Sequence, residues 1–161
     1  MVLFIECLIG VILFGISAIY LTARDPLGAI GDYPPAIRQR CIELGLIEKR
    51  EKRFTKSDLI RKGLAMVLFA VVFAFIMRHV NKAVTFKQGF SESYVIWLVI
   101  CWFDALVVDC GWFCHSPKVR IPGTEDMKEY HDYLFHIRQS LIGTLLGLPV
   151  CLLVGLFVQV L

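Results

Sequence analysis

The chain has 161 residues, of which 57% are hydrophobic and only 19% are charged. This balance is too apolar for an ordinary soluble domain and is typical of a membrane protein. The net charge of +3 is modest, and no pattern of basic and aromatic residues indicates a nucleic-acid partner. The length allows about four spans of roughly 20 residues and leaves no room for a separate soluble domain.

Four apolar stretches predict four transmembrane helices. The first lacks a basic leader and ends without a good cleavage site, so we expect a retained helix instead of a signal peptide. The predicted fold is all-α and forms a single four-span membrane domain over residues 1–161. The lipid bilayer is its expected surrounding and partner. The expected spans cover residues 2–23, 63–80, 94–113 and 140–161.

The basic residues predict the orientation of this bundle. Ten of the 17 Lys and Arg residues lie in loop 24–62, including the basic run 49–56, and four lie in loop 114–139. Basic loops stay preferentially in the cytosol. We therefore expect both loops to be cytosolic and both termini non-cytosolic, in the cell membrane or another internal membrane. Short interfacial helices are expected in these loops, one of them beginning at Pro35.

Two carboxylates interrupt the third apolar stretch. Asp104 is expected near mid-membrane and Asp109 about one turn from its cytosolic boundary. A charged side chain at the centre of a membrane helix costs roughly 2.5–3.5 kcal/mol and usually faces a partner or a watery cavity. At 100° per residue the two acids point in different directions. They indicate either a proton or cation path, or a structural role with each carboxylate neutralised or bonded to a neighbouring helix.

Loop 114–139 carries the side chains for a polar ligand. Lys118 and Arg120 could hold an anionic group while Asp109 and His115 orient it, and His131 could act as acid or base. The structural alternative is an amphipathic surface helix with solvated charges.

The turn around Asp32 belongs to the other cytosolic loop. It is expected to meet loop 114–139 over the end of the third span. Asp32 and His136 would then contribute to ligand binding, so that residues from both loops form one composite site.

Six cysteines are expected to be free thiols: Cys7, Cys41, Cys101, Cys110, Cys114 and Cys151. Cys110 and Cys114 share a helix face and precede His115, but the spacing of a zinc motif is absent. The sequence therefore predicts no metal site and no cofactor.

Small residues recur every four positions in the last stretch, at Gly143, Gly147, Cys151 and Gly155. Such a column lets another helix approach closely. The neighbour could be a helix of the same chain or of a second copy in a homo-oligomer.

Three classes of function are compatible with these patterns. The first is a cytosol-facing site at the end of the third and fourth spans that binds or modifies a lipid-like or phosphorylated amphiphile. The second is a proton or cation transporter or channel subunit using Asp104 and Asp109. The third is a non-catalytic accessory subunit of a larger membrane complex. The sequence does not decide whether the protein is an enzyme, and no motif assigns it to a known family.

Overall fold

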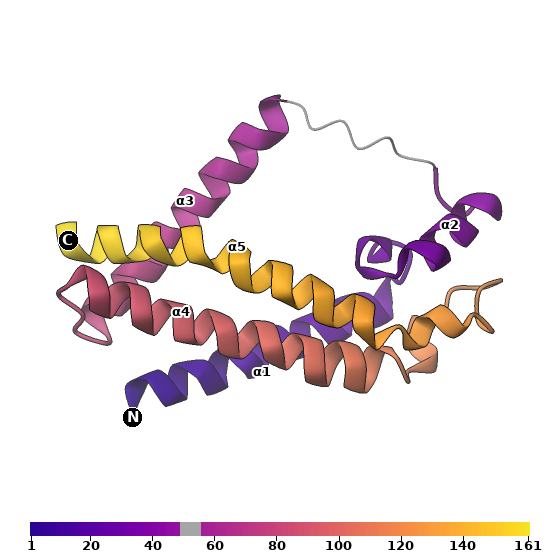
Figure 1. Ribbon diagram of the computed structural model, residues 1–161, viewed down its shortest axis with the longest axis horizontal. Coiled ribbons are helices and arrows are strands. Elements are labelled where there is room, and N and C mark those ends of the chain that lie inside the picture. The colour runs from indigo at the N-terminus through magenta and orange to yellow at the C-terminus, as the bar shows by residue number, and fades with distance from the viewer. Residues whose placement is uncertain (49–55) are drawn as a thin grey trace. The chain divides into compact units, whose positions relative to one another are not determined.

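The computed structural model describes residues 1–48 and 56–161, so most of the basic run 49–56 lies outside the described residues. All the regular secondary structure of the described residues is helical, and they contain no strand (Figure 1). Its α-helices are α1 (Val2–Arg24), α2 (Pro35–Glu43), α3 (Lys56–His79), α4 (Phe86–Phe103) and α5 (Tyr133–Val160).

Four of the helical segments in the described part of the chain are long and apolar enough to cross a membrane. They are Val2–Arg24, Leu59–His79, Phe86–Phe113 and Tyr133–Val160. The third consists of α4 and the π-helix that continues it. This result confirms the predicted all-α fold with four long apolar helices, and it follows from the length and composition of each segment.

The third and fourth long helices begin eight and seven residues before the apolar stretches that indicated them. Local caps explain the earlier starts. Before α4, the Thr85 hydroxyl accepts from the Gln88 backbone N–H at 3.3 Å, and the Gln88 side chain accepts from the Thr85 N–H at 3.2 Å. Before α5, the Asp132 carboxylate accepts from the Phe135 N–H at 2.9 Å. Hydropathy marks the apolar part of a helix, whereas the cap decides its first residue.

The structure forms two compact units. The first comprises Met1–Gly10, the described part of Lys52–Cys101, and Leu141–Leu161. Its buried core is formed mostly by small and branched side chains from α3, α4 and α5: Ala70, Ala74, Met77, Ala83, Ile96, Val154 and Val158.

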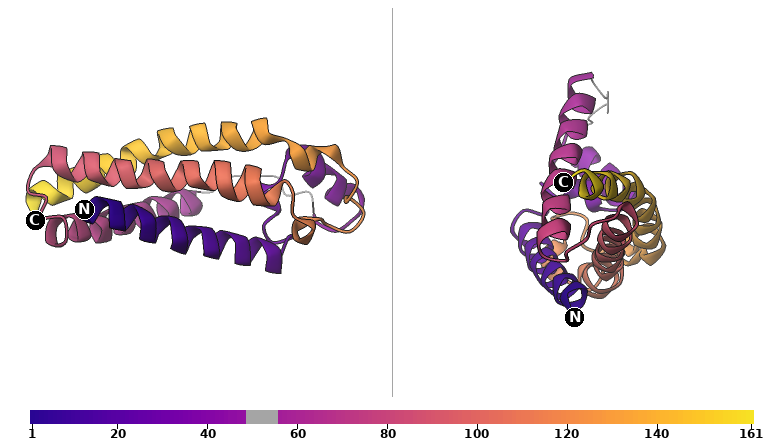
Figure 2. Two further views of the ribbon diagram at one scale, coloured as in Figure 1. Left: turned by 90° about the horizontal axis from the view of Figure 1, so that it is seen from below. Right: turned by 90° about the vertical axis from the view of Figure 1, so that its left-hand side faces the viewer.

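Within this first unit, α4 and α5 lie side by side (Figure 2). A Cβ added to Gly89 would lie 3.2 Å from the Gly155 Cα, and one added to Gly143 would lie 3.1 Å from the Cys101 sulfur. The Trp97 indole N–H donates to the Gly143 carbonyl at 3.0 Å. The glycines therefore allow the two helix backbones to approach closely.

The second unit comprises the described part of Val11–Glu51 together with Trp102–Ser140. Its core gathers side chains from both polar loops and from the end of the third long helix: Tyr33, Ile37, Cys41, Phe113, Cys114, Val119, Ile121 and Tyr130. Three short 3₁₀ helices, η1 (Ile30–Asp32), η3 (Pro117–Val119) and η4 (Lys128–His131), shape these loops.

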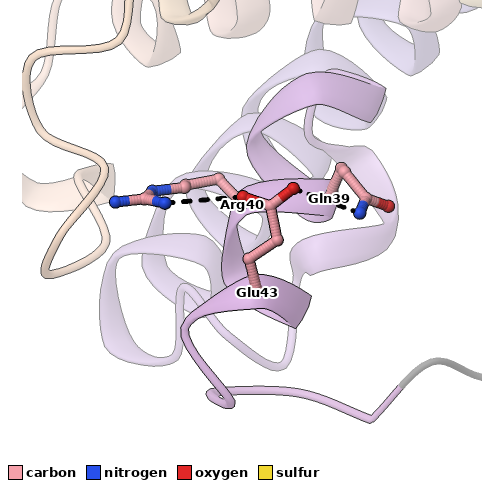
Figure 3. Close-up of polar contacts among 3 residues, drawn as sticks. All are labelled: Gln39, Arg40 and Glu43. Carbon is pink, nitrogen blue, oxygen red and sulfur yellow. Dashed lines mark hydrogen bonds and ion pairs between the residues drawn. The ribbon is translucent and has the colours of Figure 1, made fainter.

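Helix α2 begins at Pro35, as the sequence predicts, and packs Ile37 and Cys41 into this core with no exposure. Its outer face is polar. The Glu43 carboxylate accepts from Gln39 at 3.3 Å and from Arg40 at 3.4 Å (Figure 3). Exposed pairs of this kind contribute little stability, about 0–1 kcal/mol. The buried apolar face is therefore what holds α2 in place.

Candidate functional site

Three buried aromatic rings hold the polar loops of the second unit together. Tyr33 meets Phe113 edge to face with ring centroids 4.8 Å apart, and Tyr130 lies 6.0 Å from Tyr33. The Tyr33 hydroxyl donates to the Val119 carbonyl at 2.8 Å. Burial raises the pKa of the Tyr33 phenol, with a contribution from neighbouring Tyr130. The turn that carries Asp32 is thus fixed to the end of the third long helix, where the sequence predicts it.

Arg120 is held in place by this framework. Its guanidinium lies over the Tyr130 ring, 3.9 Å from the centroid, and its Nη2 donates to the Cys114 carbonyl at 2.8 Å. Its Nη1 is buried and has no hydrogen-bond partner among the described residues. Stacking on Tyr130 and the hydrogen bond to the Cys114 carbonyl therefore give Arg120 a structural role. Its role in holding an anion stays a prediction.

The segment that carries both membrane acids is a π-helix, η2 (Asp104–Phe113). Hydrogen bonds in a π-helix run from residue i to i+5, and such segments are frequent at functional sites. The Cys114 N–H accordingly donates to the Asp109 carbonyl at 3.0 Å. The wider winding reduces the angle between residues five apart compared with the 100° per residue assumed from the sequence, so Asp104 and Asp109 point in more similar directions than that assumption implies.

Asp109 pairs with His136. The His136 Nδ1 lies 3.1 Å from the Asp109 Oδ2, the His136 side chain is 3% exposed, and that of Asp109 is 25% exposed. The other ring nitrogen, Nε2, is buried and has no partner among the described residues. Phe113 packs edge-on against the imidazole at 5.2 Å. A buried imidazole thus points at a carboxylate that is one quarter exposed.

Asp32 and Asp104 complete what we call the acidic site: Asp32, Asp104, Asp109 and His136. Partial burial raises the pKa of the exposed Asp32 carboxyl; the nearby Asp109 raises it further, and His136 lowers it. Asp104 lies within electrostatic reach of Asp109, Asp32 and His136. A carboxylate near other carboxylates holds its proton more tightly than it would alone.

His115 and His131 lie in a different group. The His115 Nε2 and the Tyr133 hydroxyl are 3.1 Å apart, and the His115 and His131 ring centroids are 5.4 Å apart. All three side chains are exposed. Lys118 is exposed as well. The imidazole beside Asp109 is therefore that of His136. The predicted roles of His115 in orienting a ligand and of His131 as acid or base stay predictions.

The cysteines are free thiols. Burial raises the pKa of Cys41, and it raises the pKa of Cys114 to about 11, with Cys110 and Asp109 adding to the effect. These two thiols are therefore protonated at neutral pH and behave as small apolar groups. Within residues 1–48 and 56–161, no three His, Cys, Asp or Glu side chains converge to hold a metal ion.

The glycine column of α5 faces α4 of the same chain. Side chains added at Gly143, Gly147 and Gly155 would meet Cys101, Trp97 and Phe86 respectively. Packing within one chain thus accounts for the spacing, and a homo-oligomer formed through these glycines stays a prediction.

The sequence did not predict two features of this end of the protein. The first is the Asp109–His136 pair, for which the cap at Asp132 was the available signal: it starts α5 at Tyr133 and places His136 in the first turn. The second is Tyr133 as the partner of His115, which no local pattern indicated.

No family model, curated protein or solved structure matches the chain. The four candidate spans define its class as a multi-pass membrane protein. Any more specific function rests on the acidic site and on the loop around it.

Proposed function

We propose that the acidic site binds and exchanges protons or a small cation, in a transporter or channel subunit that crosses the membrane four times. Carboxylates and imidazoles inside membrane segments are the side chains that usually form such paths. The observation that carries the proposal is the geometry at Asp109. The Asp109 carboxylate lies 3.1 Å from the buried imidazole of His136, and the Asp109 side chain remains one quarter exposed.

Two further carboxylates, those of Asp104 and Asp32, interact electrostatically with this pair. Asp104 is the first residue of η2, five residues before Asp109, and lies within electrostatic reach of it. Asp32 lies on the exposed loop and interacts electrostatically with both Asp109 and His136. A proton or cation could pass from the exposed carboxylate of Asp32 to the pair and then to Asp104.

We place this site on the cytosolic side, because its two loops carry 14 of the 17 basic residues. Both termini are then outside. A C-terminal alkaline phosphatase fusion should be active, since the enzyme works only outside the cytosol, and a fusion after Arg120 should be inactive. The reverse pattern would contradict this orientation.

Proton exchange can be measured with the full chain reconstituted in liposomes that contain a pH-sensitive dye. After a potassium diffusion potential is imposed, wild-type liposomes should acidify faster than protein-free ones. Asp109→Asn and Asp104→Asn should each reduce the rate to the protein-free level. Asp126→Asn is the matched control, because Asp126 is an exposed acid of loop 114–139 outside the acidic site. The rate of this variant should equal that of wild type. Parallel assays with Na⁺ and K⁺ gradients test a cation other than the proton.

A second candidate function is binding of an anionic or phosphorylated amphiphile by the same end of the protein. The observations that favour it are the exposed Lys118, the exposed pair His115 and His131, and the unpaired Nη1 of Arg120. Native mass spectrometry of gently extracted protein should then show a lipid adduct that Lys118→Ala weakens. A copurifying protein, retained in all these variants without flux or lipid, would indicate an accessory subunit instead.

A further inference from the structure

We propose that His115 and His131 form a surface site for a transition-metal ion such as Ni²⁺, Cu²⁺ or Zn²⁺. This site is separate from the acidic site and does not depend on proton exchange. Neutral imidazole nitrogens are suitable ligands for these ions. The two rings come from different segments, the last turn after η2 and the end of η4, and the fold brings them together.

The spacing of the rings suits one ion between them. Their centroids are 5.4 Å apart, and the ring planes are inclined by 53°. A metal–nitrogen bond of about 2.1 Å puts the ion about 3.2 Å from a ring centroid. With one nitrogen of each ring turned to a shared ion, the centroid–ion–centroid angle would be about 115°. That angle is close to the one expected for tetrahedral coordination.

Tyr133 orients one of the ligands. Its hydroxyl lies 3.1 Å from the His115 Nε2, which leaves Nδ1 as the nitrogen available to an ion. Ligating histidines usually have their second ring nitrogen hydrogen-bonded in this way, and that bond fixes the ring orientation. Tyr133 is therefore a positioning residue in the proposed site.

The backbone on both sides is firmly held although the rings are exposed. Next to His115, the Cys114 carbonyl accepts from Arg120 at 2.8 Å. Beside His131, Tyr130 is fully buried, and Asp132 caps α5. Binding an ion therefore needs rotation of the exposed rings only, with the backbone on both sides already in place. The described residues offer no third His, Cys, Asp or Glu ligand here, so the remaining positions would hold water and stay open to a further ligand.

The test is calorimetric titration of Ni²⁺ into the tag-free full chain in detergent. Wild type should bind one Ni²⁺ per chain. His131→Asn and His115→Asn should each weaken binding at least tenfold, and the double variant should abolish it. Tyr133→Phe should weaken binding about tenfold without removing a ligand. His79→Asn is the control, because His79 is exposed on α3 and should leave the affinity unchanged.

Both substituted imidazoles are exposed, so circular dichroism and thermal unfolding of the Asn variants should match wild type. Unchanged one-to-one binding in the double variant would overturn the proposal, as would the absence of Ni²⁺ binding by correctly folded wild type. Equal loss of affinity in His79→Asn would also overturn it, because the ion would then not be held by this pair.

Discussion

The Asp109–His136 pair gives the sharpest prediction, which a double-mutant cycle can test. Asp109→Ala removes the acceptor from an imidazole whose side chain is only 3% exposed, so its Nδ1 loses the partner that the folded protein provides. Hydrogen bonds to charged groups contribute about 1.5–3 kcal/mol, and a buried donor left unpaired costs about 1–3 kcal/mol. His136→Phe keeps a ring of similar size beside Phe113 and so limits the cavity.

We expect a coupling free energy of about 1.5–3 kcal/mol between the two positions. The free energy of unfolding would be measured in mixed micelles with increasing SDS, with circular dichroism as the readout, for wild type, both single variants and the double variant. Asp126→Ala combined with His136→Phe is the control, because exposed Asp126 should be additive with it. A coupling below about 0.5 kcal/mol, the ordinary scatter of additivity, would refute the structural pairing.

Three further predictions address the packing and the loop electrostatics. Tyr33→Phe should lower the free energy of unfolding by about 1–3 kcal/mol in the same micelle assay, because its hydroxyl is the donor to a buried carbonyl; no change would contradict that bond. Gly155→Ala should lower the free energy of unfolding by about 1–3 kcal/mol, because the new Cβ would lie 2.9 Å from the Phe86 carbonyl oxygen. Gly63→Ala is the control: its Cβ meets nothing within 4 Å, so the change should be neutral or stabilising. The raised pKa of Asp32 means that the folded state binds its proton more tightly than the unfolded state, so stability falls as pH rises from below its ordinary pKa through the raised one. Asp32→Asn should therefore raise the thermal midpoint at pH 7 and leave it unchanged near pH 3.5, and an equal shift at both pH values would contradict this cause.

The sequence predicted the four long helices because each must be about 20 residues long and apolar, and composition alone reports both properties. It also placed the turn around Asp32 against the end of the third span. At that position Tyr33 packs on Phe113, and the nearby Asp109 raises the pKa of the Asp32 carboxyl. That expectation followed from topology, since both loops must lie on one side of a four-span bundle.

The arrangement within the site was less accessible to sequence reasoning. No residue type marks a π-helix, so the directions of Asp104 and Asp109 depend on a backbone hydrogen-bond pattern that the sequence does not show. The choice among histidines depended on where α5 begins. Because Asp132 caps the helix, His136 lies in its first turn and reaches Asp109, while His131 stays outside the helix.

The wider winding of η2 also makes the length of this segment a determinant of the site. Removing a single residue between Asp104 and Asp109 would leave the two acids four residues apart and would move every residue after the deletion by one position along the helix. Side-chain substitutions in the segment leave that register intact, whereas an insertion or deletion cannot. Homologous chains that keep the site should therefore tolerate changes of residue type here but not changes in the number of residues.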